Sequence, residues 1–313
     1  MALNIVTSVQ PLSIQNLVVF IYGDPGIWKT SLAFTAKKPI LFDFDKGAHR
    51  AGVYRKDTVQ INHWGEVANF TAQDLNGYDT IIVDTAGRAL DMITDAIKSD
   101  SKNTRRNGEL SMQGYGKLGS IFSNWLKMLR GMGKDVVLLA HASEDKNGDE
   151  IIKRPDMVGG SKKEAYKIAD MMGYMTIEQG NQGAVRMLNF RPHPNYLAKD
   201  SGNIGNVVVH PIDQAPNQLA CIIQATKDHI NSLSAEASKA QQDLDDLRTE
   251  LMEVETANAL NGLIDGLNTQ HPLYKQMKCD IWTASKNLNV EFDKASGKFV
   301  DVVEAETAEV ADA

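Results

Sequence analysis

The sequence predicts an α/β protein with a mainly parallel central sheet and a helical C-terminal appendage. Apolar runs of strand length alternate with helical stretches over residues 1–230, which is typical of a parallel sheet covered by helices. One of these runs leads into a Gly/Pro turn followed by Lys-Thr, and two others end in acidic residues. Residues 231–258 are instead rich in Ala, Glu, Asp, Gln and Leu, which favours one long helix.

The individual elements follow from these patterns. Predicted strands cover residues 17–22, 40–44, 58–61, 78–85, 135–140, 171–178 and 184–190. Predicted helices cover residues 65–73, 88–98 and 117–130, and a further helix opens at Ser161. The domain organisation that we expect is an α/β domain over 1–230, a long helix over 231–258, a small helical module over 259–300 and an acidic, disordered tail over 301–313.

Bulk composition narrows the class of protein. Apolar residues make up 42% and charged residues 23% of the 313 positions, as in soluble globular proteins. No apolar run is long enough to cross a membrane, and the first residues lack a secretory pattern, so we expect a cytoplasmic protein. Cys221 and Cys279 are then reduced thiols, and they lack the spacing of metal ligands.

The net charge of −7 argues against a generally basic nucleic-acid binder. The charge is uneven, however, because residues 301–313 hold five acids and no base. The remainder of the chain is near neutral, so local basic segments remain compatible with the composition.

The central motif is the stretch from Leu17 to Phe34, LVVFIYGDPGIWKTSLAF, which has the strand–turn–helix layout of a phosphate-binding P-loop. Backbone N–H groups of the loop and the start of the helix surround the phosphates. Lys29 is expected to reach the β- and γ-phosphate oxygens and Thr30 to hold Mg²⁺. The predicted nucleotide-binding residues are Gly23, Asp24, Pro25, Gly26, Ile27, Trp28, Lys29, Thr30 and Ser31.

Trp28 departs from the G-x-x-x-x-G-K-[ST] pattern, because it stands where the second glycine is required. A tryptophan in a left-handed backbone conformation costs about 1–2 kcal/mol. Two alternatives follow: the loop is slightly remodelled with the indole pointing outward, or nucleotide binding is weakened.

Two acids follow predicted strands. Asp45 comes directly after the strand at 40–44, which we expect beside the P-loop strand, where an acid can orient the water that attacks the γ-phosphate. Asp84 ends the apolar strand YDTIIVDT about 50 residues after the P-loop, which is the Walker B layout, and is expected to support Mg²⁺, with Thr85 near the phosphates. His141 ends the strand at 135–140 and is a candidate sensor of the γ-phosphate, the alternative being a capping histidine.

Two polar, basic segments are candidate contacts for a single strand of nucleic acid, because cations bind the backbone and aromatic rings stack on bases. The first covers residues 99–116 and the second residues 143–160. The candidate side chains are Lys102, Arg105, Arg106, Tyr115, Lys153 and Arg154. A solvated loop is the alternative for each segment.

In this order, the P-loop, the FDFD and IIVDT strand ends, the LLAH strand and the YLAKD stretch at 196–200 resemble the RecA-type P-loop ATPases. More narrowly, residues 10–225 are similar to phage-encoded RecA-like ATPases classed as single-strand annealing proteins. The resemblance implies ATP and Mg²⁺ as cofactors and a homo-oligomer, either ring or filament. It also implies single-stranded DNA as a partner.

The resemblance further implies roles for individual residues. Asp45 stands at the position of the general base, where many relatives carry Glu, and His141 at that of the γ-phosphate sensor. Lys199 matches the first basic residue that reaches across to a neighbouring subunit's ATP in RecA-like filaments. The second such position falls on Ser201, which is not basic.

The C-terminal third carries no predicted chemistry. Ala237, Ala240, Leu244, Leu247 and Leu251 follow steps of three and four residues, which fits either a short coiled-coil seam or an amphipathic helix packed on its own domain. Trp282 is the expected core anchor of the module at 259–300. This region is expected to serve oligomerisation or to bind a phage or host recombination or replication protein. The acidic tail either competes with DNA, docks a basic partner or solubilises the chain.

The sequence therefore predicts an ATP-hydrolysing protein that binds single-stranded DNA and promotes annealing or strand exchange in phage recombination. Hydrolysis is expected to be slow because Trp28 replaces the usual glycine. Two alternatives stay open. One is a helicase-like motor or helicase loader, and the other is a nucleotide-dependent switch or scaffold that does not hydrolyse ATP.

Overall fold

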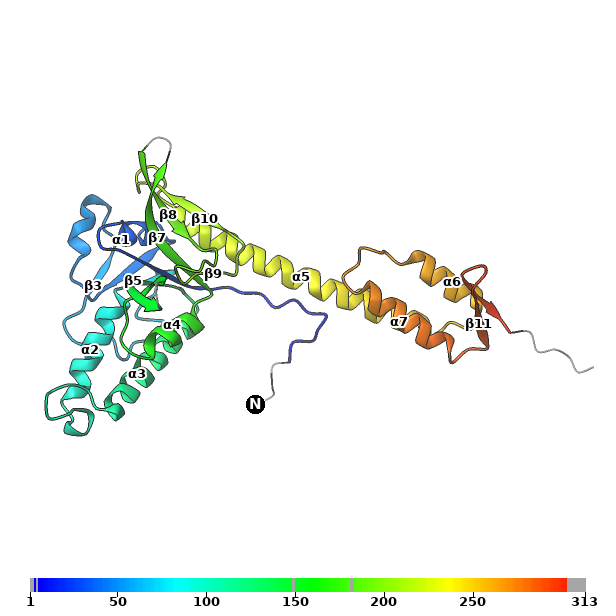
Figure 1. Cartoon of the computed structure of the whole chain (residues 1–313), viewed down its shortest axis with the longest axis horizontal. Coiled ribbons are helices and arrows are strands. Elements are labelled where there is room, and N and C mark those ends of the chain that lie inside the picture. Colours follow the sequence, from blue (N-terminus) through cyan, green and yellow to red (C-terminus); the bar gives the residue numbers. More distant parts are fainter. Residues whose placement is uncertain (1–2, 4, 148–149, 181–182, 303–313) are drawn as a thin grey trace, which may run out of the picture. The chain divides into compact units, whose positions relative to one another are not determined.

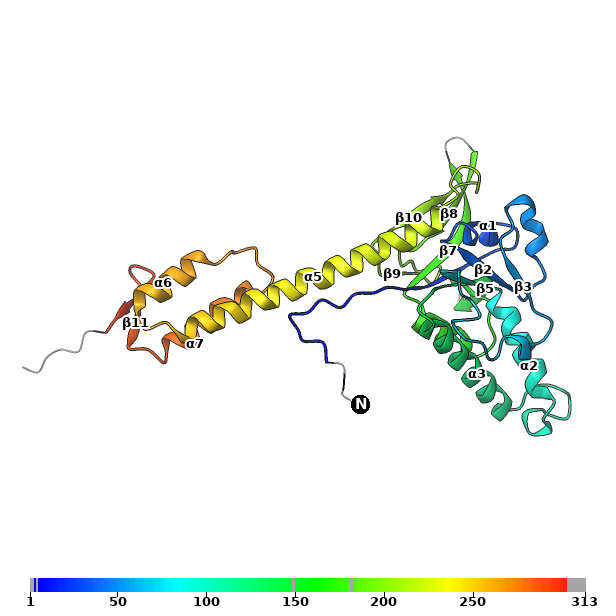
Figure 2. The same ribbon diagram turned by 180° about the vertical axis from the view of Figure 1, so that it is seen from behind.

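The computed structural model describes residues 3, 5–147, 150–180 and 183–302. Residues 14–230 form one compact unit. The described residues before 14 and after 230 form a second unit. The acidic tail at 301–313 falls almost entirely outside the described residues. Figures 1 and 2 show the elements of each unit from two sides.

The larger unit is built on one mixed sheet with a parallel centre. Its parallel strands are β1 (Val18–Gly23), β2 (Pro39–Asp43), β3 (Thr58–Gln60), β4 (Thr80–Asp84), β5 (Asp135–Asn147) and β7 (Met171–Gly180). The strand order is β10-β8-β7-β1-β5-β4-β2-β3. The carboxyl ends of the parallel strands therefore share one edge, where the motifs of β1, β2, β4 and β5 end.

Antiparallel strands extend the sheet beyond this centre. They are β6 (Glu150–Pro155), β8 (Gly183–Asn189), β9 (Lys199–Asp200) and β10 (Asn206–Val209). β7 and β8 form the hairpin that the sequence predicts, and β6 pairs with the long end of β5. The prediction that residues 143–160 form a loop is therefore wrong in part, because the β5–β6 hairpin makes up much of this segment.

Helices cover both faces of the sheet. They are α1 (Lys29–Ala33), α2 (Ala86–Lys98), α3 (Met112–Gly131), α4 (Ser161–Ile168) and the first turns of α5 (Gln218–Met252). Short 3₁₀ helices lie at Ala48–Tyr54, Trp64–Glu66 and Ser101–Asn103. Alternate residues of β1 enter different cores: Phe20 and Tyr22 pack with residues of α2 and α3, whereas Val19 and Ile21 pack with those of α1 and α5. A strand that is buried on both faces must be apolar throughout, which explains the continuous run VVFIY.

The predicted fold class, an α/β core with a mainly parallel sheet followed by C-terminal helices, is confirmed by this topology. One prediction about the sheet is wrong. The strand before Asp45 does not lie beside the P-loop strand, because β4 and β5 come between β2 and β1.

Two local predictions also need correction. The helix predicted at 65–73 is absent: after the 3₁₀ turn at Trp64–Glu66 the chain makes turns, and the Asp74 carboxylate accepts hydrogen bonds from the Thr71 backbone N–H and hydroxyl. Such side-chain bonds compete with helical ones. The second correction concerns Tyr115, which lies in α3 rather than in a loop, because Ser111 caps that helix by accepting from Gly114 N–H.

The second unit contains the later turns of α5, α6 (Ala257–Gly266), α7 (Tyr274–Ser285) and a hairpin of β11 (Val290–Asp293) and β12 (Lys298–Asp301). The module at 259–300 is thus not purely helical. Leu244 and Leu247 are buried in a cluster with Ile281 and Phe299. Of the two alternatives for this stretch, these residues therefore fit an amphipathic helix packed on its own unit. Trp282 contacts Phe299 edge-on at 5.0 Å between ring centroids, in the core position that was predicted for it.

Candidate nucleotide-binding site

The loop between β1 and α1 is shaped by two glycines and by Trp28. A side chain at Gly23 would collide with the Ile27 side chain and the Met175 carbonyl oxygen, both 2.5 Å from the position of a Cβ. Gly26 has a φ of 78° and free space around it. Both features fit a loop whose backbone closes around a ligand.

Lys29 lies inside this loop and is only 6% exposed. Its Nζ donates to the carbonyl oxygens of Gly23 at 2.9 Å and Asp24 at 2.8 Å. Burial lowers the pKa of the Lys29 amine, although Asp84 and Asp24 act in the opposite direction. A buried ammonium group held only by neutral carbonyls is a strong attractor for an anion.

Thr30 and Asp84 bring two oxygen ligands together. The Thr30 Oγ1 donates to Asp84 Oδ2 at 2.6 Å, across from the end of β4. Burial raises the pKa of the Asp84 carboxyl, which is 8% exposed, and the bond from Thr30 opposes this shift. Hydroxyl and carboxylate oxygens are the ligands that Mg²⁺ accepts, with phosphate oxygens and water completing its shell.

The two acids after β2 have different environments. The Asp43 carboxylate is buried and accepts the backbone N–H groups of Gly47 and Ala48 at 3.0 Å each, so it holds the following loop. Asp45 faces the cavity, with Oδ1 3.3 Å from Arg88 Nε and Oδ2 3.8 Å from Arg50 Nη1. The two arginines thus hold the Asp45 carboxylate in its direction toward the cavity.

His141 does not end its strand as predicted, because β5 continues to Asn147; within β5 it pairs in register with Gly23 of the P-loop strand. Its Nδ1 is buried and has no hydrogen-bond partner among the described residues. Burial first, and then the nearby charge of Lys29, lower the pKa of the imidazole. The ring is therefore neutral at pH 7 and has a free nitrogen for a bound group.

These side chains surround one cavity of 260 Å³. Its lining comprises Pro25, Gly26, Trp28, Lys29, Thr30, Ser31, Asp45, Gly47, Arg50, Ala51, Asp84 and His141. Most of these residues were predicted from the sequence. They include the five with a proposed role in binding phosphate or Mg²⁺ or in hydrolysis: Lys29, Thr30, Asp45, Asp84 and His141. An orphaned imidazole nitrogen, a buried ammonium group and paired oxygen ligands fit a nucleotide with its Mg²⁺.

Trp28 adopts a left-handed backbone conformation, with φ 77° and ψ 26°, immediately before α1. Its indole is 37% exposed, and the Arg186 guanidinium of β8 lies over it at 3.4 Å from the ring centroid. At an exposed ring a cation–π contact contributes about 0.5–1 kcal/mol, against a cost of about 1–2 kcal/mol for the left-handed backbone. The contact with Arg186 thus offsets part of the strain at Trp28.

Sequence reasoning missed three arginines of this region. Arg50 and Arg88 flank Asp45, and Arg186 reaches Trp28 from more than 150 positions along the chain. No local motif marks Arg50 or Arg186. Arg88 had a weak signal, because it lies in the first turn of the helix after the Walker B strand, where Thr85 caps the helix by accepting from Arg88 N–H.

Lys199 lies elsewhere in the larger unit. β9 pairs with Met171 and Met172 at the start of β7, so Lys199 is at the amino-terminal edge of the sheet. Its half-buried Nζ donates to the Ala169 carbonyl oxygen at 2.6 Å. Within one chain it therefore does not line the nucleotide cavity.

The candidate nucleic-acid side chains lie in two places. Lys102, Arg105 and Arg106 are exposed between α2 and α3, and the Tyr115 ring comes near Gly159, which precedes α4. Tyr115 thus lies beside the end of the second candidate segment.

Acids accompany several of these cations. Lys153 Nζ lies 2.7 Å from Glu144 Oε1, and Arg154 Nε lies 3.3 Å from Asp145 Oδ2. The charges of the β5–β6 hairpin are therefore largely compensated within the hairpin.

Two absences concern only the residues that the structure describes. No group of three or more His, Cys, Asp or Glu side chains is arranged there to hold a metal ion by itself. None of the described helices combines the length and apolarity that crossing a bilayer requires.

Comparison with known proteins gives distant likenesses. The prophage-derived uncharacterized protein YorG of Bacillus subtilis (strain 168) is 28% identical over 150 residues, which is 45% of this chain and 46% of that protein. The chain thus matches about half the length of this curated relative. A KaiC-like protein from Pyrococcus horikoshii OT3 has 13% identity and a TM-score of 0.37, covering 63% of this chain and 91% of its own.

The flagellar accessory protein FlaH from Methanocaldococcus jannaschii has 9% identity and a TM-score of 0.35, covering 65% of this chain and 90% of its own. A family model described as "AAA domain" matches residues 15–201, which is more than half of the chain and contains the P-loop, Asp45, Asp84 and His141. The chain belongs to this AAA domain family.

Proposed function

We propose that the protein is an ATPase that binds ATP with Mg²⁺ at the cavity beside the P-loop. The observation that carries this proposal is the convergence on one cavity of five side chains from separate parts of the chain: Lys29 and Thr30 at the start of α1, Asp45 after β2, Asp84 at the end of β4 and His141 in β5. Membership of the AAA domain family supports the same chemistry.

Each side chain has a defined task in this proposal. Lys29 releases its loop carbonyls and binds the β- and γ-phosphate oxygens, while the N–H groups of the loop surround the phosphates. Thr30 and Asp84 hold Mg²⁺, which supplies charge neutralisation when bound. Asp45 orients the attacking water, and the free Nδ1 of neutral His141 senses the γ-phosphate.

We further propose that nucleotide binding is coupled to single-stranded DNA and that the output is annealing or strand exchange in phage recombination. Three features support this: the exposed basic segment at 99–116, the resemblance to phage RecA-like ATPases and the prophage origin of the relative YorG. In this proposal the active form is a homo-oligomer, and the C-terminal unit contacts other recombination or replication proteins.

A non-hydrolysing switch is a second candidate, and one observation favours it. Asp45 has an arginine near each carboxylate oxygen, Arg88 at 3.3 Å and Arg50 at 3.8 Å, so both oxygens are already engaged where an attacking water would have to bind. In this case ATP binds without turnover, and the state of the site is transmitted through His141.

Steady-state ATPase measurements with and without oligo-dT test these proposals, with Lys29→Ala as the control. Stimulation by DNA that is lost in the variant supports a DNA-dependent ATPase. Bound ATP without turnover in either condition favours the switch. Strand separation in a duplex-unwinding assay would instead assign the protein to helicase-like motors.

A further inference from the structure

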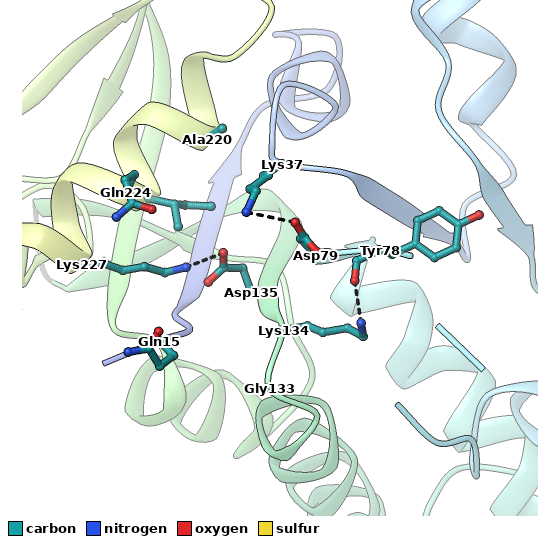
Figure 3. A pocket seen from close by; sticks show the side chains of 11 residues that line it. Gln15, Lys37, Tyr78, Asp79, Gly133, Lys134, Asp135, Ala220, Gln224 and Lys227 are labelled. Carbon is teal, nitrogen blue, oxygen red and sulfur yellow. Dashed lines mark hydrogen bonds and ion pairs between the residues drawn. The ribbon is translucent and has the colours of Figure 1, made fainter. Parts of the chain in front are cut away.

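A groove lies along the amino-terminal edge of the sheet, opposite the nucleotide cavity. It consists of two adjoining hollows of 280 and 850 Å³, which share Lys37, Tyr78, Ala220 and Gln224. Figure 3 shows the first hollow, between the start of α5 and the segments that lead into β4 and β5. We call it the lysine groove, after the cations that line it: Lys37, Lys38, Arg55, Lys56, Lys134 and Lys227.

The inner end of the lysine groove is held by internal bonds. Lys227 Nζ lies 2.7 Å from Asp135 Oδ2, and both side chains are almost buried. Lys134 Nζ donates to the Tyr78 carbonyl oxygen at 2.6 Å. Of these contacts, which Figure 3 draws, the first joins α5 to β5 and the second joins the segments that lead into β5 and β4.

The outer end carries an excess of positive charge. Lys37 and Lys38 both approach a single carboxylate oxygen, Asp79 Oδ2, at 3.2 and 3.9 Å, and their side chains are 72% and 64% exposed. Arg55 and Lys56 are exposed and take part in none of the salt bridges found among the described residues. Six cations in the groove face three acids, Asp57, Asp79 and Asp135.

Flat and apolar groups lie among these charges. Phe34, Pro39 and Pro216 line the larger hollow. Tyr78 lines both hollows, and its hydroxyl donates to Asp57 Oδ2 at 2.8 Å, which fixes the ring. A ligand that combines repeated negative charges with planar, apolar rings would match both kinds of contact.

The cations of the lysine groove differ from those of the β5–β6 hairpin. In the hairpin, Lys153 pairs with Glu144, and Arg154 pairs with Asp145, which also lies near Lys162. In the lysine groove, Arg55 and Lys56 pair with no acid of the described residues, so a polyanion that binds them displaces fewer existing ion pairs.

We propose that the lysine groove is a binding site for single-stranded nucleic acid, with phosphates on Lys37, Lys38, Arg55 and Lys56 and a base against Tyr78 and the apolar floor. The inference rests on the proposed DNA-linked function and moves the main contact to the edge of the sheet opposite the ATP. A single strand fits better than a duplex, because only unpaired bases can present their faces to the floor.

Cys221 provides a direct test, because it lines the larger hollow and is exposed, whereas the exposed Cys279 lies in the C-terminal unit. Alkylation of both thiols by N-ethylmaleimide is followed by mass spectrometry in the full chain, with and without oligo-dT. We expect oligo-dT to slow alkylation of Cys221 by roughly tenfold and to leave Cys279 unchanged.

A charge-reversal variant gives an independent readout. We expect Arg55→Glu with Lys56→Glu to weaken oligo-dT binding by tenfold or more and to lower its salt slope by roughly two. The matched control, Lys102→Glu with Arg106→Glu, changes the net charge equally at the predicted loop and should have a much smaller effect.

Three outcomes overturn the inference in distinguishable ways. Oligo-dT that binds without protecting Cys221, and equally to the Arg55/Lys56 variant, overturns the groove alone. A wild-type chain that binds no oligo-dT overturns the proposed DNA function as well. If Cys221 is already protected without DNA and becomes reactive after removal of residues 301–313, the occupant is the acidic tail instead.

Discussion

The two edges of the central sheet differ in how their charged side chains are partnered. At the carboxyl edge, each buried ionic group already has a partner: Lys29 has its loop carbonyls, Asp84 has Thr30 and Asp43 has two backbone N–H groups. At the amino edge, exposed cations outnumber the acids. The first arrangement is suited to a small ligand that binds in one orientation. The second is suited to an extended polyanion that can bind in many conformations.

Among the substitutions that test this difference between the two edges, Lys29→Ala is expected to have the largest effect. Removing the only ammonium group that lies inside the P-loop should lower kcat/KM for ATP by about 10²–10³-fold, in the range seen for a key electrostatic donor. Oligo-dT binding without nucleotide, measured by filter retention, should be unchanged. A parallel loss of DNA binding would show that the two edges are not independent.

A smaller effect is expected from the contact between Trp28 and Arg186. Arg186→Ala leaves the left-handed Trp28 unsupported, so ATP affinity measured by calorimetry should fall about two- to fivefold, or about 0.5–1 kcal/mol. In a Trp28→Gly background there is no strain to offset, so the same substitution should have little effect. An equal loss in both backgrounds would mean that Arg186 acts on the nucleotide directly.

Asp84→Asn separates stability from binding. Because burial raises the pKa of Asp84, its charged form is disfavoured in the folded protein at neutral pH. Removing the charge should raise the thermal midpoint of the ligand-free protein by about 2–4 °C, or about 1 kcal/mol, while Mg²⁺-dependent ATP binding is lost. Asp43→Asn is the matched control and should lower the midpoint, because that carboxylate accepts two backbone N–H groups.

The smallest effect concerns pH. The pKa of His141 is lowered in the folded state, so below about pH 6.5 the unfolded chain takes up a proton that the folded chain does not. Stability should therefore fall as the pH drops from 7.5 to 5.5. The contribution should stay below about 1 kcal/mol, because solvent screens the half-buried ring. Urea unfolding of the wild type and of His141→Gln checks this: an identical pH dependence would contradict it.

The sequence was sufficient for the features that depend on short stretches of chain. The apolar strands, the P-loop, the ends of β2, β4 and β5, and the β7–β8 hairpin all have local signals, because a strand buried on both faces must be apolar until it reaches its polar end. The sequence alone was therefore enough to assign Asp45, Asp84 and His141 to one edge of the sheet.

Features that depend on long-range pairing had no such signal. The order of the strands, the arginines at Asp45 and the stack of Arg186 on Trp28 join residues that are far apart along the chain. The β5–β6 hairpin was missed because its strands are largely polar. They therefore lack the apolar run on which the prediction relied. The lysine groove gathers cations from segments before β2, β3 and β5 and from α5, none of which is notably basic alone.

Trp28 gives the protein a natural optical probe. Trp64 and Trp125 are buried at 9% and 3% exposure, whereas the Trp28 indole is 37% exposed at the mouth of the nucleotide cavity and in contact with a guanidinium group. Its emission should lie to the red of that from the buried indoles. Occupation of the cavity should shift this signal selectively, so binding can be followed in the unlabelled chain by its intrinsic fluorescence.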